Sequence, residues 1–99
     1  MIVVRNTCRA KYGMGDQLVQ LAKEMLGTLA RDPRVSGVRI LTDLSGAQFT
    51  VEWEFQVASL AVFEQVFGEL TRGNDFRAWF ARLQPLVEHA ERQFFTVRT

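Results

Sequence analysis

Residues 50–55 read TVEWEF and alternate charged with large apolar side chains. Because neighbouring side chains of a strand point to opposite faces, this stretch predicts a strand with one apolar and one acidic face. Trp53 lies on the apolar face, and Glu52 and Glu54 lie on the acidic face. Such alternation is typical of a sheet that buries one side. The main question that the sequence raises is what covers the acidic side.

Periodic apolar residues on both sides of this stretch predict the remaining elements. Period-two alternation predicts strands over residues 2–10, 35–43, 48–57 and 92–98. Helical spacing predicts three helices, which begin near Asp16, Ser59 and Asp75. Pro85 interrupts the third helical pattern, so we expect a kink or a restarted turn there, with His89 near the end of the helix. The predicted order is therefore β-α-β-β-α-α-β.

This order of elements predicts the fold class and the domain organisation. With right-handed crossovers, two split β-α-β units form a four-stranded antiparallel sheet with all helices on one face. The prediction is a ferredoxin-like α+β fold that spans residues 1–99 as one domain, because no linker, repeat or low-complexity segment divides the chain. The helices are expected to cover the Trp53 face and to leave the other face open.

The composition excludes several classes of partner. Twelve basic and eleven acidic side chains leave a net charge of +1, whereas nucleic-acid binding rests on many uncompensated Lys and Arg residues. Cys8 is the only cysteine, so no intrachain disulfide can form. The sequence shows no cleavage signal and no apolar run long enough to span a bilayer. We therefore expect a soluble, cytoplasmic protein that binds neither nucleic acid nor a membrane.

Charged residues of both signs fall on the face that the helices leave open. By strand parity, the charged members are Arg5, Arg9, Arg39, Glu52 and Glu54, and the apolar members are Val3, Leu41 and Phe94. Opposite charges on neighbouring strands can pair, and interfaces combine apolar with paired charged groups. We interpret this face as one that stacks on a second copy of the chain. The alternative is a solvated sheet of mixed charge.

Four longer segments carry a resemblance to a known superfamily. They are MIVVRNTCRAKYG (1–13), VRILTDLSGAQFTVEWEF (38–55), VASLAVFEQVF (57–67) and NDFRAWFARLQPLVE (74–88). In these segments the chain resembles the dimeric α+β barrel superfamily, which includes antibiotic-biosynthesis monooxygenase-like and NIPSNAP-like proteins. The resemblance implies a homodimer in which two sheets stack into a closed barrel, so that Glu52 and Glu54 face the partner. It also implies a small-molecule pocket between the sheet and the helices of each subunit.

Two polar residues are candidates for catalysis. Asn6 is the one strongly polar residue on the apolar face of the first strand, where an unpaired buried amide costs about 1–3 kcal/mol. Asn6 either bonds to nearby backbone or, as the resemblance implies, points into the pocket. His89 is the only histidine, so no histidine dyad can form within one chain. It is either a partner of the helix dipole or a second catalytic group.

Aromatic residues at core spacings supply the candidate ligand-binding surface. They are Trp53, Phe63, Phe67, Trp79 and Phe80. Such residues form a core without any ligand, and they could also line a flat apolar pocket. No cluster of cysteine and histidine indicates a metal site. Heme-degrading members of the superfamily carry an axial histidine early in the third helix. The alignment of NDFRAWF puts Phe80 at or near that position, so we expect no heme and no other cofactor.

These observations leave two functions open. The first is a cofactor-independent monooxygenase-like enzyme that acts on a small apolar or aromatic molecule, with Asn6 and His89 as its polar groups. The second is a non-catalytic homodimer that binds a small ligand or regulates. An RNA-recognition module shares the order of elements but is excluded, because Glu52 and Glu54 on its open face would repel phosphate. A second polar residue facing inward beside Asn6 would favour the enzyme, and the sequence pattern reveals none.

Overall fold

The computed structural model describes residues 1–99 and confirms the predicted order of elements. The elements are β1 (Ile2–Ala10), α1 (Gly15–Leu29), β2 (Ser36–Thr42), β3 (Thr50–Val57), α2 (Leu60–Thr71), α3 (Asn74–Leu83), the 3₁₀ turn η1 (Gln84–Leu86) and β4 (Val87–Thr96). The strands form one antiparallel sheet in the order β2-β3-β1-β4. This is the ferredoxin-like α+β fold that the sequence predicts.

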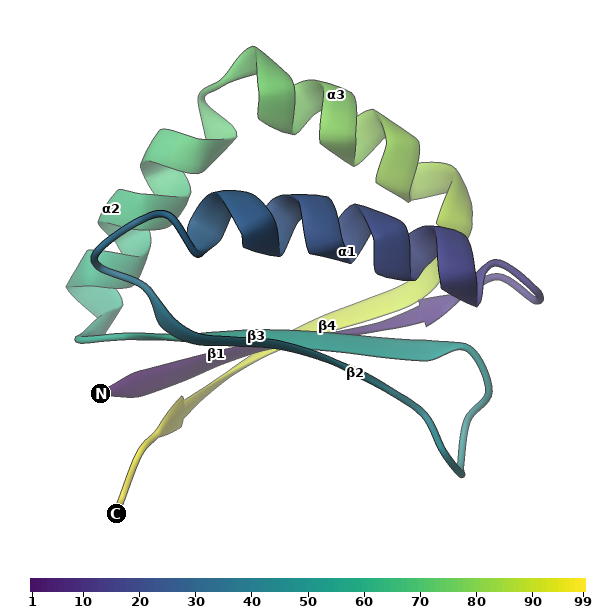
Figure 1. Cartoon of the computed structure of the whole chain (residues 1–99), viewed down its shortest axis with the longest axis horizontal. Helices are drawn as coiled ribbons and strands as arrows, with labels where there is room; N and C mark the ends of the chain where they lie inside the picture. Colours follow the sequence, from purple (N-terminus) through teal and green to yellow (C-terminus); the bar gives the residue numbers. More distant parts are fainter.

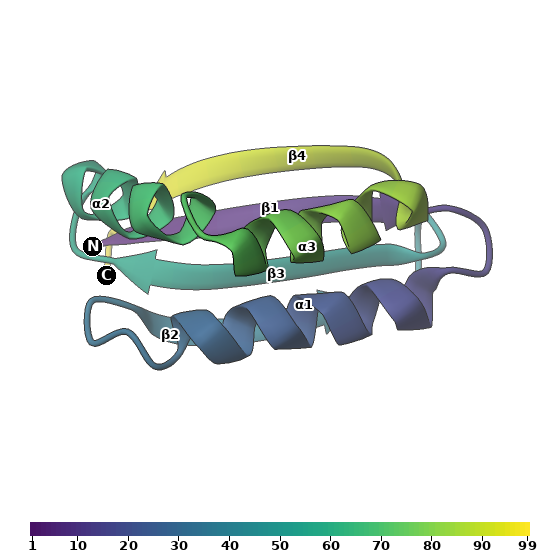
Figure 2. The same ribbon diagram turned by 90° about the horizontal axis from the view of Figure 1, so that it is seen from above.

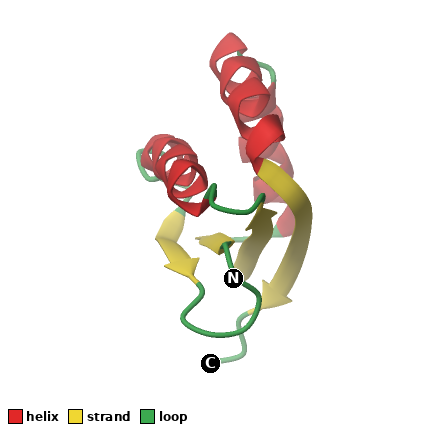
Figure 3. Cartoon of the chain, turned by 90° about the vertical axis from the view of Figure 1, so that its right-hand side faces the viewer, coloured by secondary structure: helices red, strands yellow, loops and turns green.

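The helices all lie on one face of the sheet (Figure 1). Seen from above, α1 runs along the β2 side, whereas α2 and α3 follow one another over the middle strands (Figure 2). Most of β4 lies beside these helices rather than beneath them. The side view in Figure 3 shows helices above the sheet and none below it. One sheet face is therefore covered, and the other face is open.

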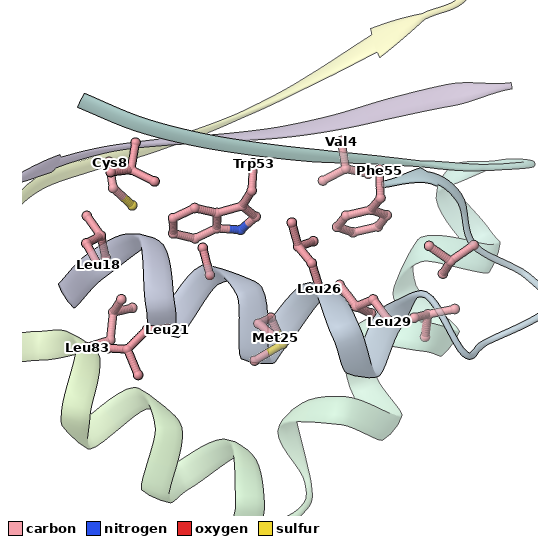
Figure 4. Packing of buried hydrophobic residues seen from close by; sticks show 14 of the residues in the cluster. Val4, Cys8, Leu18, Leu21, Met25, Leu26, Leu29, Trp53, Phe55 and Leu83 are labelled. Carbon is pink, nitrogen blue, oxygen red and sulfur yellow. The ribbon is translucent and has the colours of Figure 1, made fainter. Parts of the chain in front are cut away.

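The core fills the space between the covered face and α1 (Figure 4). Alternate side chains point from the sheet toward the helices, among them Val4, Cys8, Trp53 and Phe55. Helix α1 presents a buried stripe at helical spacing, which consists of Leu18, Leu21, Ala22, Met25, Leu26 and Leu29. Burial of one such large side chain stabilises the fold by about 1.5–3 kcal/mol. The alternation of the strands and the periodicity of the helix thus meet in one apolar layer.

Polar contacts fasten α3 to α1. Trp79 Nε1 donates a hydrogen bond of 2.8 Å to the carbonyl oxygen of Leu21. Arg82 on α3 donates two hydrogen bonds of 2.8 Å to the carboxylate of Glu24 on α1. The two helices are therefore joined by a partly buried bond and by an ion pair at the surface.

Helix α2 has a polar contact at each end. Ser59 Oγ accepts a hydrogen bond of 3.2 Å from the Val62 N–H, so the predicted start of this helix is confirmed. Near its C-terminal end, Glu69 accepts hydrogen bonds of 3.0 and 2.9 Å from Arg34, which lies in the loop before β2. Arg34 also pairs with Asp32 at 2.7 Å, which keeps its guanidinium in place.

The strand β4 begins at Val87, earlier than the sequence analysis places it. The third helix ends at Leu83, and the turn that contains Pro85 leads directly into the strand. His89 therefore lies in β4, opposite Arg9 of β1, and the expected position near the end of a helix is wrong. The apolar residues continue at helical spacing past Pro85, so the pattern does not reveal where the helix stops.

The two adjacent phenylalanines also point to other faces of the sheet than predicted. Phe94 lies opposite Val4 and points to the covered face, where its ring meets the Phe63 ring at 5.0 Å. Phe95 lies on the open face, where the Arg5 guanidinium is 4.9 Å from its ring centre. The expectation that Phe94 belongs to the open face is therefore wrong, and Phe95 takes that place.

The open face carries a network of ion pairs within the chain. Arg5 Nε lies 3.0 Å from both Glu52 Oε1 and Glu54 Oε2. Arg39, on the neighbouring strand β2, also pairs with Glu54. Glu54 is consequently only 5% exposed, although it faces away from the helices. Arg9 shares this face but is exposed, and no ion pair of the chain includes it.

The network sets the charge state of Glu54. Burial opposes ionisation, but the hydrogen bonds from Arg39 and Arg5 outweigh it and hold the pKa of Glu54 below its usual value of 4.5. A pKa that is lower in the folded state adds stability above the unfolded pKa. This contribution is lost as the pH falls below 4.5 and passes through the folded pKa.

Glu54→Gln should lower the free energy of unfolding at neutral pH by about 1–3 kcal/mol, because Arg5 and Arg39 lose the charged acceptor of their hydrogen bonds. Wild-type stability should also fall more steeply than that of the variant as the pH drops below 4.5. Urea unfolding at neutral pH and at about pH 3.5, at one protein concentration, measures both effects. Glu64→Gln, at an exposed position of α2, is the control. Equal losses for the two variants would contradict the role of the network.

Candidate functional site

A cavity of about 320 Å³ lies between the covered face of the sheet and the helices, and we call it the pocket. Its lining is mostly apolar and comes from β1, β3, β4 and all three helices. Residues 90–92 of β4 form one side of the pocket and are exposed, so this side is open to solvent. Small-molecule pockets typically enclose about 300–1,000 Å³ and have apolar linings of this kind.

Aromatic rings form the helical wall of the pocket. The lining includes every residue predicted to bind ligand, namely Trp53, Phe63, Phe67, Trp79 and Phe80. Phe63 and Phe67 stack at 5.3 Å on α2, and Phe76 and Phe80 stack at 5.9 Å on α3. Phe76 joins the two pairs through an edge contact of 6.3 Å with Phe67. Trp53 projects from the sheet on the opposite side (Figure 4). Such a series of rings suits a flat apolar ligand.

Asn6 lies in the sheet wall of the pocket and is 8% exposed. Its Oδ1 accepts a hydrogen bond of 2.8 Å from Arg92 Nε, on the residue directly opposite in β4. Its Nδ2 donates to no protein atom, and no fully buried side-chain nitrogen or oxygen of the chain lacks a partner. The Nδ2 group is therefore accessible from the pocket. The side chain of Asn6 makes no hydrogen bond to the backbone, so the expectation that it bonds to nearby backbone is wrong.

Arg92 is the polar residue that the sequence analysis missed. With Phe94 assigned to the open face, strand parity would place Arg92 there as well, whereas the actual register puts it opposite Asn6. Its guanidinium lies 4.5 Å from the centre of the Phe67 ring and 5.6 Å from that of Phe63. Partial burial lowers the pKa of Arg92, but a guanidinium stays charged at neutral pH. With Phe94 assigned to the covered face, strand parity would have placed Arg92 beside Asn6.

Cys8 contributes a buried free thiol to the pocket. Burial raises the pKa of Cys8 to about 11, and the nearby positive charge of Arg92 offsets this only in part. The thiol therefore remains protonated at neutral pH and is a poor nucleophile. Its contribution to the site is packing.

The structure does not bring His89 to the pocket. His89 lies on the open face of β4, and its Nε2 is 3.1 Å from Glu91 Oε1 on the same face. Successive side chains of a strand point to opposite faces. The His89 ring therefore points away from Asn6 and from Arg92, which lies opposite Asn6. The expectation that His89 and Asn6 form one catalytic site within a chain is therefore wrong.

The residues predicted for a dimer interface share one surface. The open face carries all five of them: Arg5, Arg9, Arg39, Glu52 and Glu54.

No group of three or more His, Cys, Asp or Glu side chains is arranged to hold a metal ion. None of the helices combines the length and the apolar character that a bilayer span requires.

The fold and the pocket define the class: a ferredoxin-like α+β protein with an apolar pocket between its helices and its sheet. Solved structures of this class are similar to almost the whole chain. An uncharacterised NIPSNAP domain protein from Burkholderia xenovorans is 21% identical, over 98% of this chain and 94% of its own, with a TM-score of 0.83. A NIPSNAP family protein from Agrobacterium tumefaciens is 21% identical, over 96% and 90%, with a TM-score of 0.78. SnoaB, a cofactor-independent oxygenase from Streptomyces nogalater, is 14% identical, over 99% and 93%, with a TM-score of 0.77.

No family model and no curated protein matches the sequence. At the identities of the solved structures, the likeness establishes the fold and carries no statement about activity. At the level of the fold, it confirms the resemblance to NIPSNAP-like and antibiotic-biosynthesis monooxygenase-like proteins.

Asn6→Ala should lower the free energy of unfolding by about 0.5–1.5 kcal/mol, the usual net contribution of one hydrogen bond. The loss stays small because Arg92 lies on the side of the pocket that is open to solvent, so its Nε can bond to water instead. Denaturant unfolding measures the change, with Gln20→Ala, at an exposed position of α1 outside the pocket lining, as the control. A loss of about 3 kcal/mol or more would show that Asn6 holds a further buried partner.

Proposed function

We propose that the protein binds a small apolar or aromatic molecule in the pocket. One observation carries the proposal: an apolar cavity of about 320 Å³ in which two polar side chains, Asn6 and Arg92, meet on the sheet side. A cavity that opens to solvent and is walled mostly by apolar side chains favours an apolar ligand over water. Ligand pockets combine mostly apolar walls with a few placed polar groups in the same way.

We also propose that the protein forms a homodimer through its open face. The charges of Glu52 and Glu54 are matched within the chain by Arg5 and Arg39, so this surface can be covered without leaving an unpaired carboxylate. The same face presents apolar side chains, including the 41% exposed Phe95. A mixture of aromatic, aliphatic and paired charged groups is typical of an interface between proteins.

A third proposal is that the protein acts on its ligand as a cofactor-independent monooxygenase-like enzyme. It is supported by the fold shared with SnoaB and by the polar pair Asn6–Arg92, which could position the reacting group. Dioxygen would be the oxidant. One of its oxygen atoms would convert an activated CH₂ group of the substrate into a carbonyl group, and the other would leave as water. The substrate would supply all of the electrons, so it must first lose a proton and become electron-rich.

The pocket offers no side chain to take this proton at neutral pH. Cys8 is already protonated, and the Glu91 carboxylate lies beside His89 on the open face. The proton would therefore pass to water, which limits the substrates to compounds that ionise readily. This absence favours the alternative function, a homodimer that binds a small ligand or regulates without catalysis. Dioxygen uptake in the presence of a bound ligand separates the two.

Ala90→Phe should weaken the binding of a flat aromatic probe such as 2-naphthol by about tenfold or more, because the new ring would fill the pocket from β4. Quenching of Trp53 and Trp79 fluorescence measures the affinity, since both residues line the pocket. Ala81→Phe is the matched control, because Ala81 is exposed on α3 and outside the lining. Unchanged affinity in Ala90→Phe would show that the probe binds elsewhere.

The wild-type protein should sediment as a dimer at micromolar concentration, and Phe95→Glu should sediment as a monomer. The new carboxylate would be buried in the stacked sheets beside Arg5, whose charge Glu52 and Glu54 already balance, and would therefore add an unbalanced negative charge. Leu60→Glu introduces the same group at an exposed position of α2, on the helical side, and should leave the dimer intact. A monomeric wild type, or a dimer that survives Phe95→Glu, would contradict the interface.

A further inference from the structure

We propose that the pocket selects an aromatic molecule that carries one anionic oxygen group, a carboxylate or a phenolate, and that Arg92 pairs with this group. The proposal rests on the proposed binding function and adds to it the charge of the ligand. Arg92 would then determine specificity, while the aromatic walls supply the apolar contact area.

The charge of Arg92 is not balanced within the chain. No ion pair includes Arg92, and the carboxylate of its neighbour Glu91 lies on the other face of β4, 3.1 Å from His89 Nε2. The titratable group that acts on Arg92 is Cys8, a protonated thiol. The pocket thus holds one positive charge between apolar walls. An anion interacts with such a charge more strongly than it would in bulk water.

The guanidinium of Arg92 is oriented, and its outer edge is free. Its Nε is occupied by the bond of 2.8 Å to Asn6 Oδ1, and its carbon lies 4.5 Å from the centre of the Phe67 ring. Nη1 and Nη2 donate to no protein atom. These two nitrogens form a planar fork that matches the two oxygens of a carboxylate. Because the fork is already positioned, less rotamer freedom is lost when a ligand binds.

The surroundings of this fork indicate the rest of the ligand. The accessible Nδ2 of Asn6 is a further donor on the same wall of the pocket. The stacked pairs on α2 and α3, Phe63–Phe67 and Phe76–Phe80, offer flat apolar surfaces. An inorganic anion would leave these rings uncovered, and a hydrocarbon would leave the fork without an acceptor. A molecule with an aromatic ring and one anionic group satisfies both parts.

Two probes of equal shape test the proposal: 2-naphthoate, which is anionic, and 2-naphthamide, which is neutral. Titrations followed by tryptophan fluorescence should show that the wild type binds naphthoate about tenfold more tightly, or better. Arg92→Gln should abolish this preference. Arg92→Lys should retain part of it, because the ammonium keeps the charge but not the planar fork. A guanidinium that only shields the rings of α2 from water would give no preference for either probe.

Arg31→Gln is the matched control, because it removes an exposed arginine that lies outside the pocket lining, between α1 and β2. It should leave the preference unchanged, and a loss of preference there would place the anion outside the pocket and overturn the proposal. Equal affinities of the wild type for the two probes would also overturn it, while the proposed binding function would stand. Binding of neither probe would overturn the proposed function as well. Should Arg92→Gln fail to fold, the wild-type comparison and Arg92→Lys still decide.

Discussion

The pairing of the central strand determines which side chains share a face. β1 is hydrogen-bonded to β3 on one side and to β4 on the other, and side chains alternate along each strand. Asn6 faces the helices, so Trp53 and Arg92, which lie opposite it on β3 and β4, face the helices as well. A shift of one residue in either pairing would exchange residues of the pocket with residues of the open face. The site therefore depends on the strand register more than on any single contact.

The order of the elements, the starts of the helices and the aromatic wall could be predicted from the sequence because they rest on strong periodicity. The stretch TVEWEF predicts which side chains of β3 point to each face, and helical spacing predicts the apolar sides of α1, α2 and α3. β4 is different, because it is an edge strand whose residues are almost all exposed and which carries polar residues on both faces. The adjacent Phe94 and Phe95 fit either facing. Arg92 and His89 could therefore be placed only once the register of β4 against β1 was known.

Buried charge is paired on the open face of the sheet and unpaired on the covered face. On the open face, Glu54 is enclosed by Arg5 and Arg39, so its charge is matched inside the chain. On the covered face, Arg92 has a hydrogen-bond acceptor in Asn6 but no carboxylate. Arginine thus pairs with carboxylates on one side, whereas on the other side its charge has no carboxylate partner. Paired charge suits a surface that another chain covers, and unpaired charge suits a surface that a small molecule visits.

The contacts that hold the helices also bear on how fast the pocket fills and empties. α3 is fastened to α1 through Trp79 and Arg82, and α2 is fastened at Glu69 to the loop before β2. The helices meet β4 through aromatic side chains, as in the contact between Phe63 and Phe94, rather than through ion pairs. Entry of the proposed ligand beside α2 would therefore need only the rotation of exposed rings such as Phe94, while every polar link of the helices stays closed. Side-chain rotations in exposed residues take picoseconds to nanoseconds, whereas collective helix motions take microseconds or longer. Exchange of the proposed ligand would then need no opening of the fold.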